Sequence, residues 1–294
     1  MSCIGRFAPS PTGPLHFGSL LAALASYLDM RSRNGEWLLR IEDLDPPREQ
    51  PGAADSILHT LDAFGLHWDG PVVYQSKRLK CYQDALELLL DQGAAYRCSC
   101  SRKQLRARGV TGLYDGHCRR HPPSASASCA VRVIHPQAEQ QFHDRIQGSR
   151  TYNWQNERGD FVVFRRDGLF AYQLAVVVDD AAAGVTDILR GSDLIDETPH
   201  QIALQALLGY STPQYAHIPV ITNPAGQKLS KQNLAPAIDP GQRQQLLLRA
   251  LSLLGQKPPA DLATASRDEL LSWAITHWNI TAVPGTLSLC EPET

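Results

Sequence analysis

Residues 2–19 read SCIGRFAPSPTGPLHFGS. Ile4, Phe7 and Ala8 are apolar enough for a short buried strand. The prolines after them prevent regular structure, because each lacks an amide donor and restricts its predecessor. Gly18 and Ser19 then open a run of helix-forming residues. The free amides and the positive dipole end of a helix N-terminus bind anions, and Gly18 lets a flat group approach the backbone closely. The pattern predicts an anion site with His16 at its mouth; an ordinary surface loop is the alternative interpretation.

A second stretch indicates which kind of anion is bound. Lys228 and Lys231 stand three residues apart on a loop that residues 223–226 (NPAG) introduce. Two ammonium groups suit a polyphosphate, since each is a compact point charge. A short stretch with two lysines is, by itself, typical of a solvated loop. Together with the first stretch it favours nucleotide binding.

The two stretches resemble the signatures of class I aminoacyl-tRNA synthetases, here HFGS at residues 16–19 and KLSK at residues 228–231. Two further motifs, RFAPSPTG at residues 6–13 and LRIEDLD at residues 39–45, resemble the glutamyl-tRNA synthetase branch. The motifs occur in the family's order. The resemblance implies an α/β fold: a Rossmann-type catalytic core with an inserted α+β zinc-containing module and a short helical C-terminal tail.

Four segments follow from this interpretation. We expect residues 1–95 to form the first half of the catalytic domain and residues 96–170 the inserted module. Residues 171–240 should return the chain to the core sheet, with 171–180 (AYQLAVVVDD) as part of that return, and carry the lysine loop. Residues 241–294 should form a helical tail.

The composition fits a globular protein with a reducing environment. The chain has 294 residues, a net charge of −2 and seven cysteines. An odd number of cysteines favours thiols used as ligands or core residues. No apolar run is as long as a membrane span, and the chain starts directly with a strand-like segment, so we expect no signal peptide, no membrane partner, and a cytoplasmic monomer.

The resemblance also implies roles for individual residues. Glu42 follows the predicted strand at residues 37–41, at the end where ligands bind in open α/β sheets, and it would hold the α-amino group of glutamate. Arg6 and Arg190 would pair with substrate carboxylates, and Tyr172 would lie beside the substrate, although a core tyrosine is the alternative. The implied glutamate-binding residues are Arg6, Ala8, Ser10, Glu42, Tyr172 and Arg190. The implied ATP-binding residues are His16, Gly18, Ser19 and Lys231, and the implied catalytic residues are His16, Lys228 and Lys231.

Residues 97–120 change the character of the chain, with seven basic residues and one acid. Cys98, Cys100 and Cys118 could build a tetrahedral zinc site; buried free thiols are the alternative, because Cys-x-Cys is tighter than the usual spacing. The resemblance implies Tyr114 as the fourth zinc ligand. His117 is the chemically more ordinary choice, and His121 and Cys129 also stay open. The basic flank suits phosphate contacts, or is a solvated charged helix at residues 102–108.

The tail after Pro240 predicts two helices, at residues 242–254 and 267–278. Some fifty residues cannot form the anticodon-binding domain of full-length glutamyl-tRNA synthetases, so the chain resembles the subfamily that modifies queuosine. This resemblance implies that L-glutamate is activated with ATP and Mg²⁺, without tRNA, and then transferred to the queuosine base in the anticodon of tRNA(Asp). Three alternatives stay open: the core of an ordinary glutamyl-tRNA synthetase, a nucleotidyltransferase that does not use tRNA, and an inactive RNA-binding paralogue.

Overall fold

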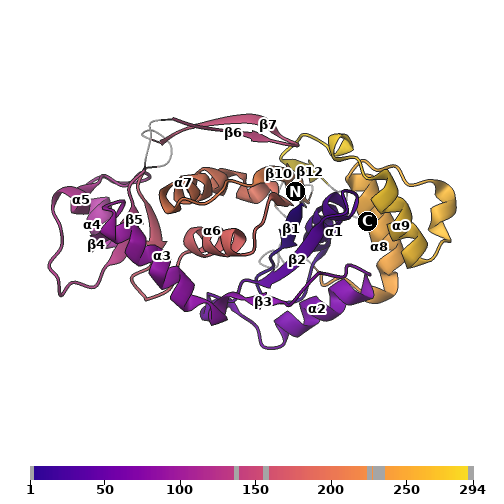
Figure 1. Cartoon of the computed structure of the whole chain (residues 1–294), viewed down its shortest axis with the longest axis horizontal. Helices are drawn as coiled ribbons and strands as arrows, with labels where there is room; N and C mark the ends of the chain where they lie inside the picture. The colour runs from indigo at the N-terminus through magenta and orange to yellow at the C-terminus, as the bar shows by residue number, and fades with distance from the viewer. Residues whose placement is uncertain (1–2, 136–138, 155–158, 224–226, 228–235, 291–294) are drawn as a thin grey trace.

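The central strands of the catalytic part pair in parallel (Figure 1). The computed structural model describes residues 3–135, 139–154, 159–223, 227 and 236–290. One sheet has the order β1-β2-β3, and β9 pairs with β10 in parallel. The amide of Thr186 donates to the carbonyl of Ile4 at 2.9 Å, which brings the start of β9 beside β1. These strands are β1 (Ile4–Phe7), β2 (Glu36–Ile41), β3 (Val73–Tyr74), β9 (Asp187–Gly191) and β10 (Gln214–Ile218).

Helix α1 (Phe17–Arg31) is the centre of the main core. Leu20, Leu24 and Leu28 are fully buried, as the apolar run after Ser19 predicts. Gly5 permits the close approach of β1, because a Cβ atom at this position would lie 2.6 Å from the side chain of Met30. The remaining helices of the catalytic part are α2 (Ala53–Ala63), α3 (Leu79–Asp91), α6 (Tyr172–Ala182) and α7 (Thr198–Leu208).

Residues 171–180 differ from the prediction that they return the chain to the sheet directly. They belong largely to helix α6, which lies between the inserted module and β9 in the chain. Residues 174–180 are all buried. A segment that is apolar on all sides shows no periodicity that separates a strand from a buried helix, and the three valines favoured the wrong choice.

The inserted module contains an antiparallel sheet of order β4-β5-β8 and two short helices. The alternation of apolar and polar residues near 130–134 and the apolar run near 160–165 correspond to the strands β5 and β8. The core of the module is shared with helices α3, α6 and α7. Its elements are β4 (Ala95–Cys98), α4 (Arg102–Ala107), α5 (His117–Arg120), β5 (Ala130–Val133) and β8 (Phe161–Phe164).

A long hairpin of β6 (Glu139–Asp144) and β7 (Gly148–Asn153) extends from the module to the catalytic core (Figure 1). Its strand β6 pairs with β10 through Asp144 and Tyr215, which gives a sheet of order β7-β6-β10-β9. Residues 96–170 therefore do not form one separate sheet, because this hairpin joins the parallel strands of the core.

The C-terminal segment contains the two predicted helices, α8 (Arg243–Leu253) and α9 (Arg267–His277), and both pack into the main core. A short strand that the sequence did not predict, β12 (Ser288–Cys290), pairs in parallel with β11 (Val220–Thr222). None of the described helices is long and apolar enough to cross a membrane.

Candidate active site

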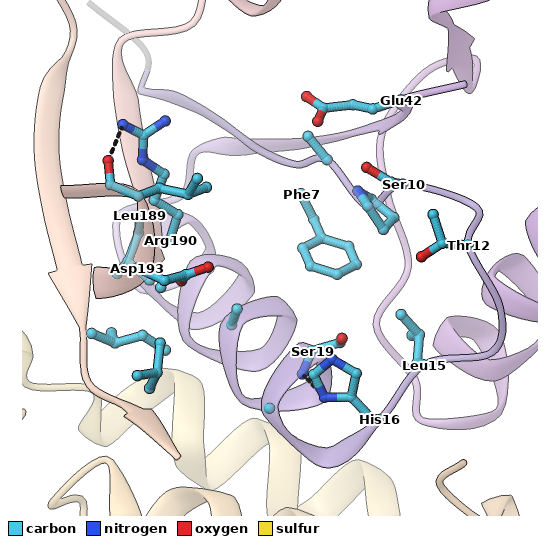
Figure 2. A pocket seen from close by; sticks show the side chains of 18 of the residues that line it. Phe7, Ser10, Thr12, Leu15, His16, Ser19, Glu42, Leu189, Arg190 and Asp193 are labelled. Carbon is cyan, nitrogen blue, oxygen red and sulfur yellow. Dashed lines mark hydrogen bonds between the residues drawn. The ribbon is translucent and has the colours of Figure 1, made fainter. Parts of the chain in front are cut away.

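A pocket of about 710 Å³ opens at the carboxyl ends of β1, β2 and β9. Figure 2 shows Arg190 and Asp193 on one side of it, Glu42, Ser10 and Thr12 on the other, and His16 and Ser19 at one end. The structure thus brings together nine of the predicted site residues from distant parts of the chain. They are Arg6, Ala8, Ser10, His16, Gly18, Ser19, Glu42, Tyr172 and Arg190. Lys228 and Lys231 lie outside the described residues.

His16 caps the N-terminus of α1 at one end of the pocket (Figure 2). Its Nδ1 atom accepts a hydrogen bond from the amide of Ser19 at 3.3 Å. The helix begins at Phe17, one residue before the predicted start. After the stretch that contains the two lysines, Ala237 forms a bridge with His16, and the amide of Ile238 donates to the carbonyl of Leu15 at 3.0 Å. The helix N-terminus and the chain that follows the lysine loop therefore meet at the pocket.

Three buried charged groups, Arg6, Arg40 and Asp180, lie beneath Glu42. Arg6 donates through Nε and Nη2 to the two oxygens of Asp180, at 3.2 and 3.3 Å. Arg40 donates to Asp180 at 2.6 Å and to Glu42 at 3.3 Å. Burial works against ionisation of Asp180, but Arg40 and Arg6 outweigh it and lower its pKa. For Glu42 burial prevails over the same two arginines and raises the pKa. A cationic ligand group beside Glu42 would therefore restore its preference for the ionised form.

Arg190 is a second buried cation at the pocket wall, with only 5% of its surface exposed. It donates to the hydroxyl of Tyr172 at 3.3 Å, to the hydroxyl of Thr198 at 2.9 Å and to Nε2 of His217 at 3.0 Å. Burial raises the pKa of Tyr172, so this hydroxyl keeps its proton. The arginine is thus held in one orientation beside a neutral phenol.

The sequence did not predict several residues of this region as part of the site: Asp180, Arg40, Asp193, Asp144 and His217. Asp179 and Asp180 end an apolar run, and such buried acids signal an internal ion pair. Arg40 stands in the predicted strand before Glu42, which is the same kind of signal. No pattern in the sequence connects Asp144 with His217, because 73 residues separate them.

Three sulfur atoms gather in the inserted module. The Sγ atoms of Cys98, Cys100 and Cys118 lie within 4.8 Å of one another. The hydroxyl of Tyr114 lies 3.4 Å from the sulfurs of both Cys98 and Cys100. A tetrahedral zinc ion bound at about 2.3 Å places its sulfur ligands about 3.8 Å apart, and Cys100 and Cys118 are 3.4 Å apart. The predicted group is therefore assembled, and its three thiols could hold a metal ion.

Two arginines donate hydrogen bonds to sulfur atoms of this group, while burial raises the pKa of Cys100. Arg108 donates to Cys100 at 3.3 Å and Arg132 donates to Cys98 at 3.4 Å. Burial works against ionisation of Cys118, but hydrogen bonds from Tyr114 and Cys100 outweigh it and lower the pKa of Cys118 to about 7.

The alternative zinc ligands do not join this group. Among the described residues, the atoms that gather as a possible metal site come from the three cysteines alone. The rings of His117 and His121 stack on each other with centroids 4.8 Å apart. Cys129 is half-buried and is a free thiol. The geometry favours Tyr114 as the fourth group.

Comparison with known proteins identifies the family of this chain. The family model for the catalytic domain of class I tRNA synthetases (E and Q) matches residues 3–283. A glutamyl-Q tRNA(Asp) synthetase of Thiobacillus denitrificans is 56% identical over 295 residues, covering 99% of this chain and 98% of the relative. One of Pseudomonas fluorescens is 53% identical, covering 99% of this chain and 97% of the relative.

Solved structures give the same result at the level of the fold. A glutamate-tRNA synthetase of Elizabethkingia anophelis superposes with a TM-score of 0.82 at 26% identity, covering 99% of this chain and 68% of that chain. A glutamate tRNA ligase of Elizabethkingia meningosepticum, solved in complex with its amino acid, has a TM-score of 0.82 at 25% identity, covering 97% and 66%. The chain belongs to the class I tRNA synthetases of the glutamate and glutamine branch.

Proposed function

We propose that the protein activates L-glutamate with ATP and transfers it to the queuosine base in the anticodon of tRNA(Asp). The observation that carries this proposal is the similarity, over nearly the full length, to several curated proteins named glutamyl-Q tRNA(Asp) synthetase. The pocket supports it, because its charges fit an amino acid with two carboxylates and one ammonium group.

In this proposal glutamate lies between Arg190 and Glu42, which Figure 2 shows on opposite sides of the pocket. Glu42 takes the ammonium group, and Arg190 and Arg6 take carboxylates, since a guanidinium offers paired donors to a carboxylate. The hydroxyl of Tyr172 lies beside Arg190 and adds a neutral polar contact. Ala8 and Ser10 complete the wall on the side of Glu42.

Activation needs positioning and charge stabilisation and no protein nucleophile. The α-carboxylate of glutamate attacks the α-phosphorus of ATP, a new C–O–P linkage forms, and pyrophosphate leaves. Negative charge on the phosphoryl oxygens is stabilised by His16, by the N-terminus of α1 near Gly18 and Ser19, and by Lys228 and Lys231. Mg²⁺ would accompany the ATP phosphates.

Transfer completes the reaction. A hydroxyl of the queuosine base attacks the acyl carbon of glutamyl adenylate, an ester forms and AMP leaves. The seven basic residues of segment 97–120 are all exposed, which suits contacts with RNA phosphates that position the nucleic acid without reading its sequence. They are Arg97, Arg102, Lys103, Arg106, Arg108, Arg119 and Arg120.

The proposed metal is one structural Zn²⁺ held by Cys98, Cys100, Tyr114 and Cys118. A zinc ion with four protein ligands stabilises its domain and has no open position for catalysis. It would tie β4 to the start of α5, because Cys98 ends the strand and Cys118 lies in the helix.

One labelling experiment tests the function. Purified protein is incubated with ATP, labelled glutamate and tRNA(Asp) that either carries or lacks queuosine. We expect label only on the tRNA with queuosine, and we expect it to survive removal of the 3′ terminal adenosine. Release of the label with that adenosine would show an ordinary aminoacyl ester at the 3′ end and contradict this proposal. Because its substrates are cytoplasmic, we place the protein there, acting as a monomer.

A further inference from the structure

The structure assigns a positioning role to Asp144 and His217, which lie behind Arg190 and are both fully buried. They would orient the guanidinium of Arg190 toward the substrate carboxylate. This inference rests on the proposed function, because it concerns the arginine that is proposed to bind glutamate.

The hydrogen bonds determine which nitrogen of His217 carries the proton. Nε of Arg190 lies 3.0 Å from Nε2 of His217, and Nδ1 of His217 lies 2.6 Å from Oδ2 of Asp144. A guanidinium can only donate, so Nε2 must be the acceptor. The proton of the neutral imidazole is therefore on Nδ1, where it is donated to Asp144.

This arrangement defines the plane of the Arg190 guanidinium. Nε is bound to His217, and Nη2 donates to the hydroxyl of Thr198 at 2.9 Å and to the carbonyl of Leu194 at 3.3 Å. Since the guanidinium is a rigid planar fork, these contacts leave Nη1 on the side of Tyr172. Binding groups held in advance lose less entropy when substrate arrives.

Asp144 has a second task in the hairpin. Its Oδ1 atom accepts from the amides of Ile146 at 3.0 Å, Gln147 at 2.8 Å and His217 at 3.2 Å. The side chain of Gln147 also donates to the carbonyl of His217 at 2.8 Å. The end of β6 thus connects the long hairpin to β10 (Figure 1). Through the side chain of His217 it also connects the hairpin to Arg190 at the pocket wall.

The electrostatic environment keeps His217 neutral, as this role requires. Burial lowers its pKa to about 4. The charge of Arg190 lowers this pKa further, whereas the charges of Asp144 and Asp193 raise it. The ring of Tyr215 stacks against the imidazole, with centroids 6.2 Å apart. A neutral imidazole can accept from Arg190, whereas an imidazolium would repel it.

Asp144→Asn separates the two tasks of Asp144. The amide oxygen can still accept from the three backbone amides, so the turn is preserved. The new NH₂ group would face Nδ1 of His217 and requires an acceptor there. The proton of the imidazole must then move to Nε2, where it opposes the N–H of Arg190.

The experiment measures glutamate-dependent ATP–pyrophosphate exchange. Losing a hydrogen bond to a charged group predicts that Asp144→Asn raises the KM for glutamate about ten- to a hundredfold, while the KM for ATP stays unchanged. The matched control is Asp160→Asn, a buried carboxylate of the inserted module that accepts from Tyr96 at 2.6 Å and from the amide of His135 at 3.2 Å. We expect this control to change stability and to leave the KM for glutamate unaltered. An unaltered glutamate KM in Asp144→Asn would overturn the inference.

A second measurement uses the unmodified protein. The ¹⁵N shifts of histidine side chains should show His217 neutral, with its proton on Nδ1, at pH 7; a proton on Nε2 would overturn the positioning role. If exchange in the unmodified protein did not depend on glutamate, the proposed function would be wrong. The tautomer of His217 would in that case still test how Arg190 is oriented.

Discussion

Arg6 binds both carboxylate oxygens of Asp180, and each of these side chains is only 4% exposed. The same carboxylate also accepts from Arg40 at 2.6 Å. Two guanidinium groups at the base of the pocket therefore depend on one acid that helix α6 contributes. A buried charge that loses its partner costs far more free energy than an exposed one.

Asp180→Asn should therefore destabilise the protein by about 3 kcal/mol or more, since it leaves two buried cations without their shared anion. Because Arg6 lines the pocket, the KM for glutamate should rise as well. Urea unfolding and the exchange assay measure the two effects. Asp84→Asn breaks the exposed pair with Lys80 and serves as a control that should change neither quantity. Equal stability of both variants would show that the shared ion pair does not contribute.

Cys118→Ser should abolish stoichiometric zinc binding, because it removes one of the four proposed ligands. No other cysteine, histidine or acidic residue among the described residues gathers at this site to replace it. Metal analysis of purified protein measures this. Cys81→Ser is the matched control, since this exposed thiol lies on α3 outside the group. Tyr114→Phe should weaken zinc binding, and His117→Ala should leave it unchanged. The opposite order for the last two variants would identify the histidine as the fourth ligand.

Much of the fold follows from local patterns in the sequence. Local sequence determines the secondary structure of several elements. They are the strand and helix around residues 4–28, the helices of the tail and the strands of the inserted module. Helix α6 was predicted wrongly, because its buried positions surround it and no polar face marks its period. The pairing of β6 with β10 could not be predicted from residues 139–153 alone, because it depends on a contact with a distant part of the chain.

The candidate site divides in the same way. Residues on the pocket surface, such as His16 and Glu42, belong to continuous motifs, so the sequence indicated them together. The groups behind them depend on tertiary contacts over long separations: Asp180 meets Arg6 across 174 residues, and Asp144 meets His217 across 73. No local pattern specifies such pairs, although a buried acid after an apolar run is a usable signal.

Lys231→Ala should reduce glutamate-dependent exchange about a hundred- to a thousandfold, the usual effect of removing one preorganised contact to transition-state charge. The fold should stay intact, which circular dichroism and thermal unfolding can verify. Lys80→Ala removes an exposed lysine of α3 and should retain full activity. Near-normal exchange in Lys231→Ala would contradict the assignment of this lysine.

The pH dependence of stability gives the last prediction. The pKa of His217 is lowered by burial from its ordinary value of 6.5 to about 4. Between these values the unfolded chain binds a proton that the folded protein does not, so this residue's contribution is present above pH 6.5 and is lost as the pH falls toward 4.

The free energy of unfolding should thus fall by about 2 kcal/mol between pH 7 and pH 5 through this group alone. His217→Gln lacks the titrating ring, so the stability difference between the two proteins should shrink by that amount over the same interval. Asp144 does not confuse the result, because its own pKa is lowered from 3.8 and its contribution is lost only at more acidic pH. Urea unfolding of both proteins at pH 7 and pH 5 measures the change. A difference that stays constant with pH would mean that His217 titrates alike in the folded and unfolded chain, and so that it is not held neutral behind Arg190.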